Sequence, residues 1–268
     1  MTINLSIKEI DEICKATPHY AVSRVNKFVM FLGHAHSGHS IIGSILDSHH
    51  DAGIVNELNL PKLLLDKNLD RETINKVVYN FANSKKQIWK NTEYKYEIPE
   101  GRQGNVKTPL VLGDKKGGGS IRVIRNHPET FRKIFNIYKS ELKIINVIRN
   151  PYDNIAAYAH YWREPLSKKH AIRYFENVEV VNNCKSLISN QNWITVRYDS
   201  FIENPALILK NLFDFLDIKT NQNMLENMAS IVNPNIKSKT SNYQWDGKLI
   251  DYIEKKRSIL KKNDRYLI

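Results

Sequence analysis

The sequence is poor in cysteine and has no long apolar run. Its 268 residues include only two cysteines, Cys14 and Cys184, so a disulfide framework is excluded and a reducing compartment is expected. No stretch approaches the roughly 18 consecutive apolar residues of a membrane span, and the first residues lack the apolar core of a secretory signal. These absences predict a cytoplasmic protein without a transmembrane segment.

Acidic residues are also scarce relative to basic ones. Asp and Glu number 28 against 40 Lys and Arg, which gives a formal net charge of +12. Such an excess indicates either Lys-rich solvated faces or attraction to an anion, such as a nucleic acid, an acidic membrane or a small polyphosphorylated ligand. Arginine-rich runs and helix-turn-helix or zinc-finger spacings are missing. The composition therefore favours a small anionic ligand and argues against specific binding of nucleic acid.

Short apolar segments alternate with segments of helical periodicity. Strands are expected at residues 27–33, 106–112, 142–148 and 193–196, with helices between them, and 113–120 is expected to be a glycine-rich loop. This alternation predicts a three-layer α/β fold, in which a parallel sheet of about four or five strands is flanked by helices. Residues 1–26 are expected to form a peripheral helical arm, and 27–268 a single domain.

The segment 33–40 (GHAHSGHS) joins the first expected strand to a helix. Backbone N–H groups at such a helix start bind phosphate or sulfate. Ser37 and Ser40 add hydroxyl donors, and Gly38 lets the backbone approach a ligand closely. A Walker A motif is excluded, because no Lys-Ser/Thr follows the glycine. The other interpretation is a plain tight turn.

Histidines of this segment raise the question of a metal site. His34, His36 and His39, with His49 and His50 downstream, are potential ligands. Three or four of them would have to converge on one ion. The loop would then have to curl around the metal and lose its anion-facing geometry, so we expect no metal.

Two charged residues stand near expected strand ends. Arg149 follows the strand at 142–148, and its planar fork suits a phosphate, although it could instead pair with Asp153. Glu57 follows a short apolar segment, and a carboxylate at a strand end could act as a general base. Alternatively, Glu57 is the N-terminal charge of the helix that begins near Asn59.

Three segments together resemble the PAPS-dependent sulfotransferase family, whose donor is 3′-phosphoadenosine-5′-phosphosulfate (PAPS). FLGHAHSGHSIIGSILDSHHD (31–51) resembles the family's 5′-phosphosulfate loop, and VIRNPYDNIAAYAHYW (147–162) resembles its 3′-phosphate motif. VRYDSFIENPALILKNLFDFLDI (196–218) is similar to a third family segment. The motifs occur in the family's order, in the style of its bacterial and tyrosylprotein or carbohydrate members.

The resemblance implies a P-loop NTPase-like sulfotransferase fold and assigns roles by position. The 5′-phosphosulfate would be bound by His36, Ser37, Gly38, His39 and Ser40. Arg149 would bind the 3′-phosphate and Tyr198 the nucleotide. Glu57 would be the catalytic base, and Lys115, or else Lys116, would neutralise the leaving group.

The implied reaction moves a sulfuryl group from PAPS to a hydroxyl or amine of a small-molecule or carbohydrate acceptor, releasing adenosine 3′,5′-bisphosphate (PAP). Two residues depart from the family pattern: His36 replaces the loop's usual Lys or Arg, and Ala157 replaces a serine. The alternatives are a P-loop kinase-like enzyme and an inactive relative that binds nucleotide or nucleic acid. Residues 59–105 and 160–190 are expected to line the acceptor pocket, with aromatic candidates Trp89, Tyr94, Tyr96, Tyr158, Tyr161 and Trp162.

Overall fold

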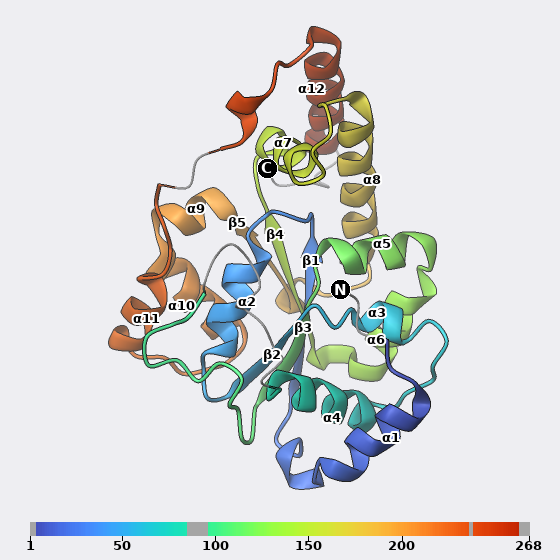
Figure 1. Cartoon of the computed structure of the whole chain (residues 1–268), viewed down its shortest axis with the longest axis vertical. Coiled ribbons are helices and arrows are strands. Elements are labelled where there is room, and N and C mark those ends of the chain that lie inside the picture. The colour runs from blue at the N-terminus through green and yellow to red at the C-terminus, as the bar shows by residue number, and fades with distance from the viewer. Residues whose placement is uncertain (1–3, 85–95, 236–237, 263–268) are drawn as a thin grey trace.

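A five-stranded parallel sheet forms the centre of the molecule (Figure 1). The computed structural model describes residues 4–84, 96–235 and 238–262. The strands are β1 (Lys27–Gly33), β2 (Ala52–Asn56), β3 (Val111–Lys115), β4 (Leu142–Ile148) and β5 (Trp193–Arg197). They lie in the order β2-β3-β1-β4-β5, and every pairing is parallel. The expected α/β class with about four or five strands is confirmed.

Helices cover both faces of this sheet. One layer contains α1 (Ile7–Ala16), α4 (Arg71–Ala82), α5 (Gly118–Asn126), α6 (Glu129–Tyr138) and α8 (Lys168–Lys185), with the short α3 (Leu60–Leu63) beside them. The opposite layer contains α2 (His39–Asp47), α9 (Tyr198–Glu203), α10 (Pro205–Phe215) and α11 (Gln222–Ala229). Because side chains alternate along a strand, Phe28 and Met30 of β1 pack into the first core and Val29 and Phe31 into the second. Burial on both faces explains why β1 is apolar throughout.

A third, smaller core extends the molecule beyond the carboxyl ends of the strands. It is built by α7 (Pro151–Tyr161), α12 (Gly247–Lys262) and part of α8, with Ile155, Phe175 and Ile253 buried between them. These three helices form the upper part of the molecule in Figure 1. The core supports α7, which carries residues of the 3′-phosphate-like motif.

The second expected strand was placed too early. Strand β3 spans Val111–Lys115 rather than 106–112, since Pro109 has no N–H to donate to a ladder. Residues 113–120 are therefore not one loop: Gly113–Lys115 belongs to β3, and Gly118 begins α5. At Gly113 a Cβ would lie 2.6 Å from the Val29 carbonyl oxygen, so a glycine is needed here for close pairing with β1. The glycines thus serve packing as well as a turn.

The amino-terminal segment is helical and packs on α4. Helix α1 begins with a capping box between Ser6 and Glu9, and its Ile10 is buried in the first core together with Val22 and Val25. The division into an arm and a domain stays a prediction.

Trp89 and Tyr94, two of the aromatic candidates for the acceptor pocket, lie outside the described residues. Among the described helices, none combines the length and apolar character needed to span a bilayer.

Candidate functional site

All strands end at one edge of the sheet, and the candidate residues follow these ends. Glu57 comes after β2, and Lys115 is the last residue of β3, paired with Asn56. The loop at 34–38 follows β1, Arg149 follows β4, and Tyr198 follows β5. In open parallel sheets, ligands bind outside the carboxyl ends of the strands. Parallel pairing therefore gathers these five positions from a stretch that runs from residue 34 to residue 198.

The loop between β1 and α2 is held in place by hydrogen bonds that its backbone carbonyl groups accept from side chains. Asn154 Nδ2 donates to the Ala35 carbonyl oxygen at 2.8 Å, and Arg149 Nη1 donates to that of His36 at 3.4 Å. Ser37 Oγ donates to the His34 carbonyl oxygen at 2.5 Å. Fixing these carbonyls leaves the start of α2, where the first N–H groups have no intrahelical partner, to face an anion. Asn154 was not among the sequence candidates, although it lies in the 147–162 motif.

Gly38 lies directly against Tyr198. Its φ is +99°, and a Cβ would lie 2.2 Å from Cδ2 of the tyrosine ring. Only glycine adopts this conformation and allows this approach. The loop after β1 is therefore packed closely against the residue that follows β5.

Two of the loop histidines point into the protein. His39 is buried, its Nε2 lies 3.2 Å from the Leu32 carbonyl oxygen, and burial lowers its pKa to about 4. The His34 ring stacks on Tyr174 at 4.0 Å, and burial lowers its pKa to about 3. Both rings are neutral at pH 7. Any contact of His39 with a ligand would therefore come through its backbone N–H.

His36 has the position and the exposure to meet a ligand. It is half-buried, with φ +65°, and its ring lies 4.8 Å from that of Tyr161. Burial, reinforced by the positive charge of Arg149, lowers the pKa of His36 below its usual value. The ring is therefore neutral in the free protein near pH 7 and does not replace the family's permanent cation there.

A glutamate and two lysines form the centre of the site. Lys115 Nζ lies 2.5 Å from Glu57 Oε1 and donates to Ser40 Oγ at 3.1 Å, and Lys116 Nζ pairs with Glu57 Oε2. Burial acts to raise the pKa of Glu57, but the two ammonium groups outweigh it and hold that pKa below its usual value. Burial lowers the pKa of Lys115. Both lysines thus reach the carboxylate that the sequence singled out.

The backbone at Glu57 and Asn59 adopts a strained conformation beside the two lysines. Glu57 and Asn59 have φ values of +74° and +65°, a region that costs free energy for residues other than glycine. The Glu57 N–H donates to the Lys115 carbonyl oxygen at 3.0 Å, and the Leu60 N–H donates to Asp114 Oδ2 at 2.7 Å. Glu57 thus follows the end of β2, as the first interpretation required. The sequence analysis did not single out Asp114. Its position directly before Lys115, at the end of a strand, could have indicated that it lies near the site.

Arg149 lies between the loop and Tyr198. Its Cζ is 5.2 Å from the centroid of the Tyr198 ring, and its Nε is 3.8 Å from Asp153 Oδ2. The alternative ion pair with Asp153 is therefore present, yet Arg149 Nε has no hydrogen-bond partner. Asp153 also accepts from Thr240 Oγ1 at 2.5 Å. A half-buried, incompletely bonded guanidinium beside an aromatic ring is a suitable receptor for a phosphate.

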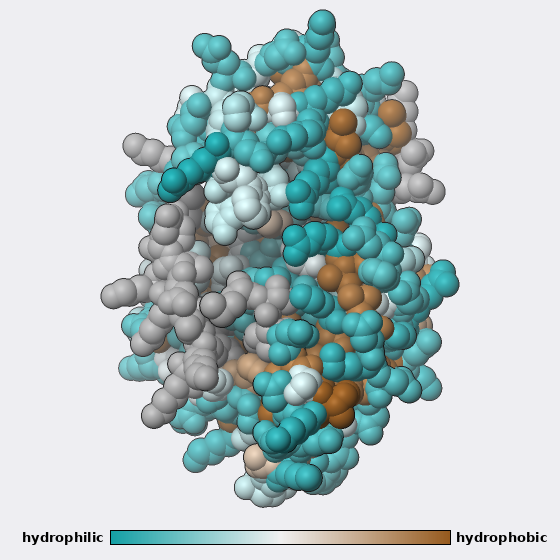
Figure 2. Space-filling model, turned by 45° about the vertical axis from the view of Figure 1, so that its right-hand side comes forward, coloured by the Kyte–Doolittle hydropathy of each residue, from teal (hydrophilic) through white to brown (hydrophobic). Residues whose placement is uncertain are grey.

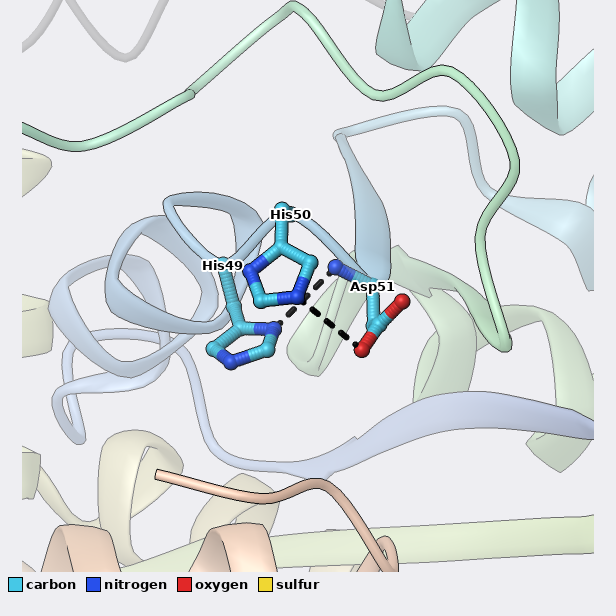
Figure 3. A group of neighbouring side chains, drawn as sticks. All are labelled: His49, His50 and Asp51. Atoms are coloured by element: carbon cyan, nitrogen blue, oxygen red, sulfur yellow. Dashed lines mark hydrogen bonds and ion pairs between the residues drawn. The ribbon is translucent and has the colours of Figure 1, made fainter. Parts of the chain in front are cut away.

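Two of the histidines belong to a cluster of potential metal ligands. Within the described residues, one group of three potential ligands lies close together, His49, His50 and Asp51 (Figure 3). His49 Nδ1 accepts from the Asp51 N–H at 3.1 Å, and its Nε2 lies 3.1 Å from the Lys219 carbonyl oxygen. Both ring nitrogens of His49 are therefore occupied, and this group does not fit a metal ion.

A model of the sulfotransferase family matches residues 29–222. The chain belongs to the sulfotransferase family. The matched segment contains every candidate site residue, from the loop after β1 to Tyr198. The expected enzyme type, a PAPS-dependent sulfotransferase, is confirmed at the level of the family, and the family implies PAPS as the donor.

Several solved structures of sulfotransferases have the same fold as this protein. The sulfotransferase domain of the Synechococcus PCC 7002 olefin synthase matches with a TM-score of 0.52 and 13% identity, over 94% of this chain and 98% of that one. Sulfotransferase STF9 from Mycobacterium avium matches with a TM-score of 0.53 and 10% identity, over 96% and 80%. Mouse sulfotransferase SULT7A1, solved with PAP, matches at 0.50 and 14% identity, over 95% and 90%. No curated protein matches the sequence.

Proposed function

We propose that this sulfotransferase moves a sulfuryl group from PAPS to a hydroxyl or amine of its acceptor, with Glu57 as general base and Lys115 at the leaving group. The contact of Lys115 with both Glu57 and Ser40 carries the proposal. This contact brings together the proposed base, a positively charged group and the first turn of α2, the helix that follows the proposed phosphosulfate loop. Such positioning is most of what group transfer through a loose transition state requires.

Donor binding would use two receptors on the same edge of the sheet. The loop residues His36, Ser37, Gly38, His39 and Ser40 would hold the 5′-phosphosulfate through backbone N–H groups and hydroxyls. Arg149 would hold the 3′-phosphate, and Tyr198 would contact the nucleotide. The side chain of Arg149 is only 12% exposed, which strengthens its attraction for a dianion relative to that in water.

The proposed reaction forms one bond and breaks another. The acceptor oxygen or nitrogen attacks the sulfur, the bond from sulfur to the 5′-phosphate oxygen breaks, and the acceptor proton passes to Glu57. Lys115 stabilises the negative charge that develops on the departing PAP. The proposal includes no metal, since lysine and loop N–H groups would supply the positive charge. A P-loop kinase is disfavoured because the loop has no lysine.

Lys115 would also control when Glu57 becomes a base. In the structure, Glu57 is paired with both lysines, which lowers its pKa and makes it a weak proton acceptor. A bound phosphosulfate would offer Lys115 a second anion. Drawing the ammonium towards the donor would raise the pKa of Glu57 at the moment when a base is needed.

The direct test is incubation with PAPS and a pooled acceptor extract. We expect release of PAP that depends on the extract, and thermal stabilisation of the protein by PAPS or PAP. If PAP were not released with any acceptor and neither PAPS nor PAP stabilised the protein, the proposal would be wrong. A larger stabilisation by ATP with magnesium than by PAPS would favour the kinase alternative.

Arg149→Ala is expected to weaken PAP binding by roughly 10- to 100-fold, because charge-assisted hydrogen bonds are worth roughly 1.5–3 kcal/mol. Isothermal titration calorimetry measures this change. Arg24→Ala is the matched control, because Arg24 precedes β1 and so lies at the opposite edge of the sheet. Equal PAP affinities of wild type and Arg149→Ala would remove the 3′-phosphate assignment.

Binding of PAPS is expected to become tighter as pH falls from 8 to 6. The pKa of His36 is below its usual value in the free protein, and a neighbouring phosphosulfate would raise it. The donor therefore binds the protonated ring better, and affinity rises as pH falls through the bound-state pKa, levelling off below the free-state pKa. His36→Lys should flatten this profile in titrations with PAP. An unchanged profile in the variant would show that His36 does not meet the donor.

A further inference from the structure

A hollow of ≈ 400 Å³ lies between α5 and the start of α8, and its lining includes none of the residues proposed to contact the nucleotide. Its lining includes Arg122 of α5, Lys169 and Arg173 of α8, and the rings of Tyr158 and Trp162. The surface that Figure 2 shows is mostly hydrophilic. Positive charge and aromatic rings together are typical of a pocket for a polar or anionic ring compound.

This hollow adjoins the phosphosulfate loop. The ring of Tyr158 meets that of His36 edge-on, with centroids 6.4 Å apart. Helix α5 begins three residues after Lys115, and a Cβ on its Gly118 would lie 2.8 Å from the Ala35 nitrogen. Helices α5 and α8 belong to the first helical layer, whereas Tyr198 belongs to the opposite one. The hollow is therefore placed to receive an acceptor beside the sulfuryl end of the donor.

The charge of the lining is positive. One carboxylate, Glu164, faces the hollow, and it is already paired with Lys169 and with His170 Nε2, both at 2.9 Å. Arg122 and Arg173 form no ion pair with any described residue, and the contact of Arg173 is with the Tyr158 ring, 4.8 Å from its centroid. Two guanidinium groups thus have no anionic partner in the part of the chain that the structure describes. Their planar forks suit a carboxylate or a sulfate better than a hydroxyl.

Exposed rings border the same region. Trp162, which lines the hollow, is 55% exposed, and the neighbouring Tyr161 is 63% exposed. The two rings contact each other, with centroids 5.3 Å apart, and contiguous exposed apolar surface is more indicative of a ligand site than a single exposed side chain is. A flat sugar or aromatic ring would cover Trp162 while its anionic group reached the arginines.

We infer that the acceptor is a ring compound that carries a carboxylate or sulfate in addition to the group that is sulfated, and that Arg122 and Arg173 bind this anion. The inference rests on the proposed function, because it takes the loop beside the hollow to hold PAPS. It narrows the acceptor from any hydroxyl or amine compound to an anionic one.

Calorimetry with the PAP-saturated protein tests the inference on three pairs of probes that differ in charge. The pairs are p-nitrophenyl glucuronide and glucoside, N-acetylglucosamine 6-sulfate and N-acetylglucosamine, and 4-hydroxyphenylacetate and its amide. We expect the anionic member of at least one pair to bind about tenfold tighter or more. The first and third pairs report on carboxylate recognition and the second on sulfate recognition.

The double variant Arg122→Ala/Arg173→Ala should lose this preference, while Arg122→Lys/Arg173→Lys should keep part of it. Arg132→Ala, on the exposed side of α6, removes one arginine away from the hollow and should leave the preference intact. No preference in any pair, including no binding by any probe, would overturn the inference, as would a preference that survives in the double alanine variant. Thermal stabilisation by PAP, measured alongside, reports separately on the proposed function.

Discussion

Glu57→Gln is expected to lower the turnover of PAPS roughly 100- to 10,000-fold, the usual contribution of a positioned general base. Glutamine keeps the shape of the side chain, and its single amide oxygen can still accept a hydrogen bond from one of the two lysines, but it does not take a proton at neutral pH. The loss should therefore fall on kcat. Release of PAP in single-turnover experiments with pooled acceptor measures it.

Binding of PAP provides the internal control for this variant. The two lysines would lose their carboxylate, so affinity for the anionic nucleotide should stay equal to wild type or increase. Glu129→Gln, at the exposed start of α6, is the matched substitution and should leave turnover unchanged. If Glu57→Gln retained full turnover, the base would have to be another group, while the rest of the proposal would stand.

Lys115→Met is expected to lower kcat by roughly 100- to 1,000-fold, the effect of removing one group that stabilises developing charge. Methionine fills the buried space of the lysine stem, since Lys115 is only 3% exposed. The substitution would also remove the ammonium that contacts both Glu57 and Ser40. Initial rates with saturating PAPS, with the melting temperature as a check on folding, measure the change.

Lys116→Met separates the two lysines. Lys116 donates to the other carboxylate oxygen of Glu57, but among the described residues it forms no hydrogen bond with Ser40 or the loop. We therefore expect a smaller loss of kcat for Lys116→Met than for Lys115→Met. The reverse order would assign the leaving-group role to Lys116.

Patterns that depend on neighbouring residues predicted the fold well. The strand at 27–33 and that at 142–148 were expected with the bounds that the structure has, because an apolar run ended by Gly33 or by Arg149 is a local signal. The strand β3 was misplaced, because its glycine and charged residues, Gly113 to Lys115, read as a loop. Their burial comes from pairing with β1 and β2, which no local pattern reveals.

The contacts within the site could be anticipated only in part. The parallel sheet made it predictable that Glu57, Lys115 and Arg149 would share an edge. The αL backbone near Glu57 depends on partners distant in sequence, Lys115 and Asp114. The inward rotation of the His39 ring depends on how the folded loop places it against the Leu32 carbonyl oxygen. The roles of these residues towards PAPS stay predictions, which the variants above test.

The salt-bridged state of Glu57 also bears on the order in which substrates bind. As long as both lysines hold the carboxylate, a hydroxyl that arrives alone meets a group unable to deprotonate it. Both substrates must therefore be bound before the acceptor proton can be removed, so the reaction should pass through a ternary complex. Double-reciprocal plots of initial rate against PAPS at several acceptor concentrations should then intersect rather than run parallel.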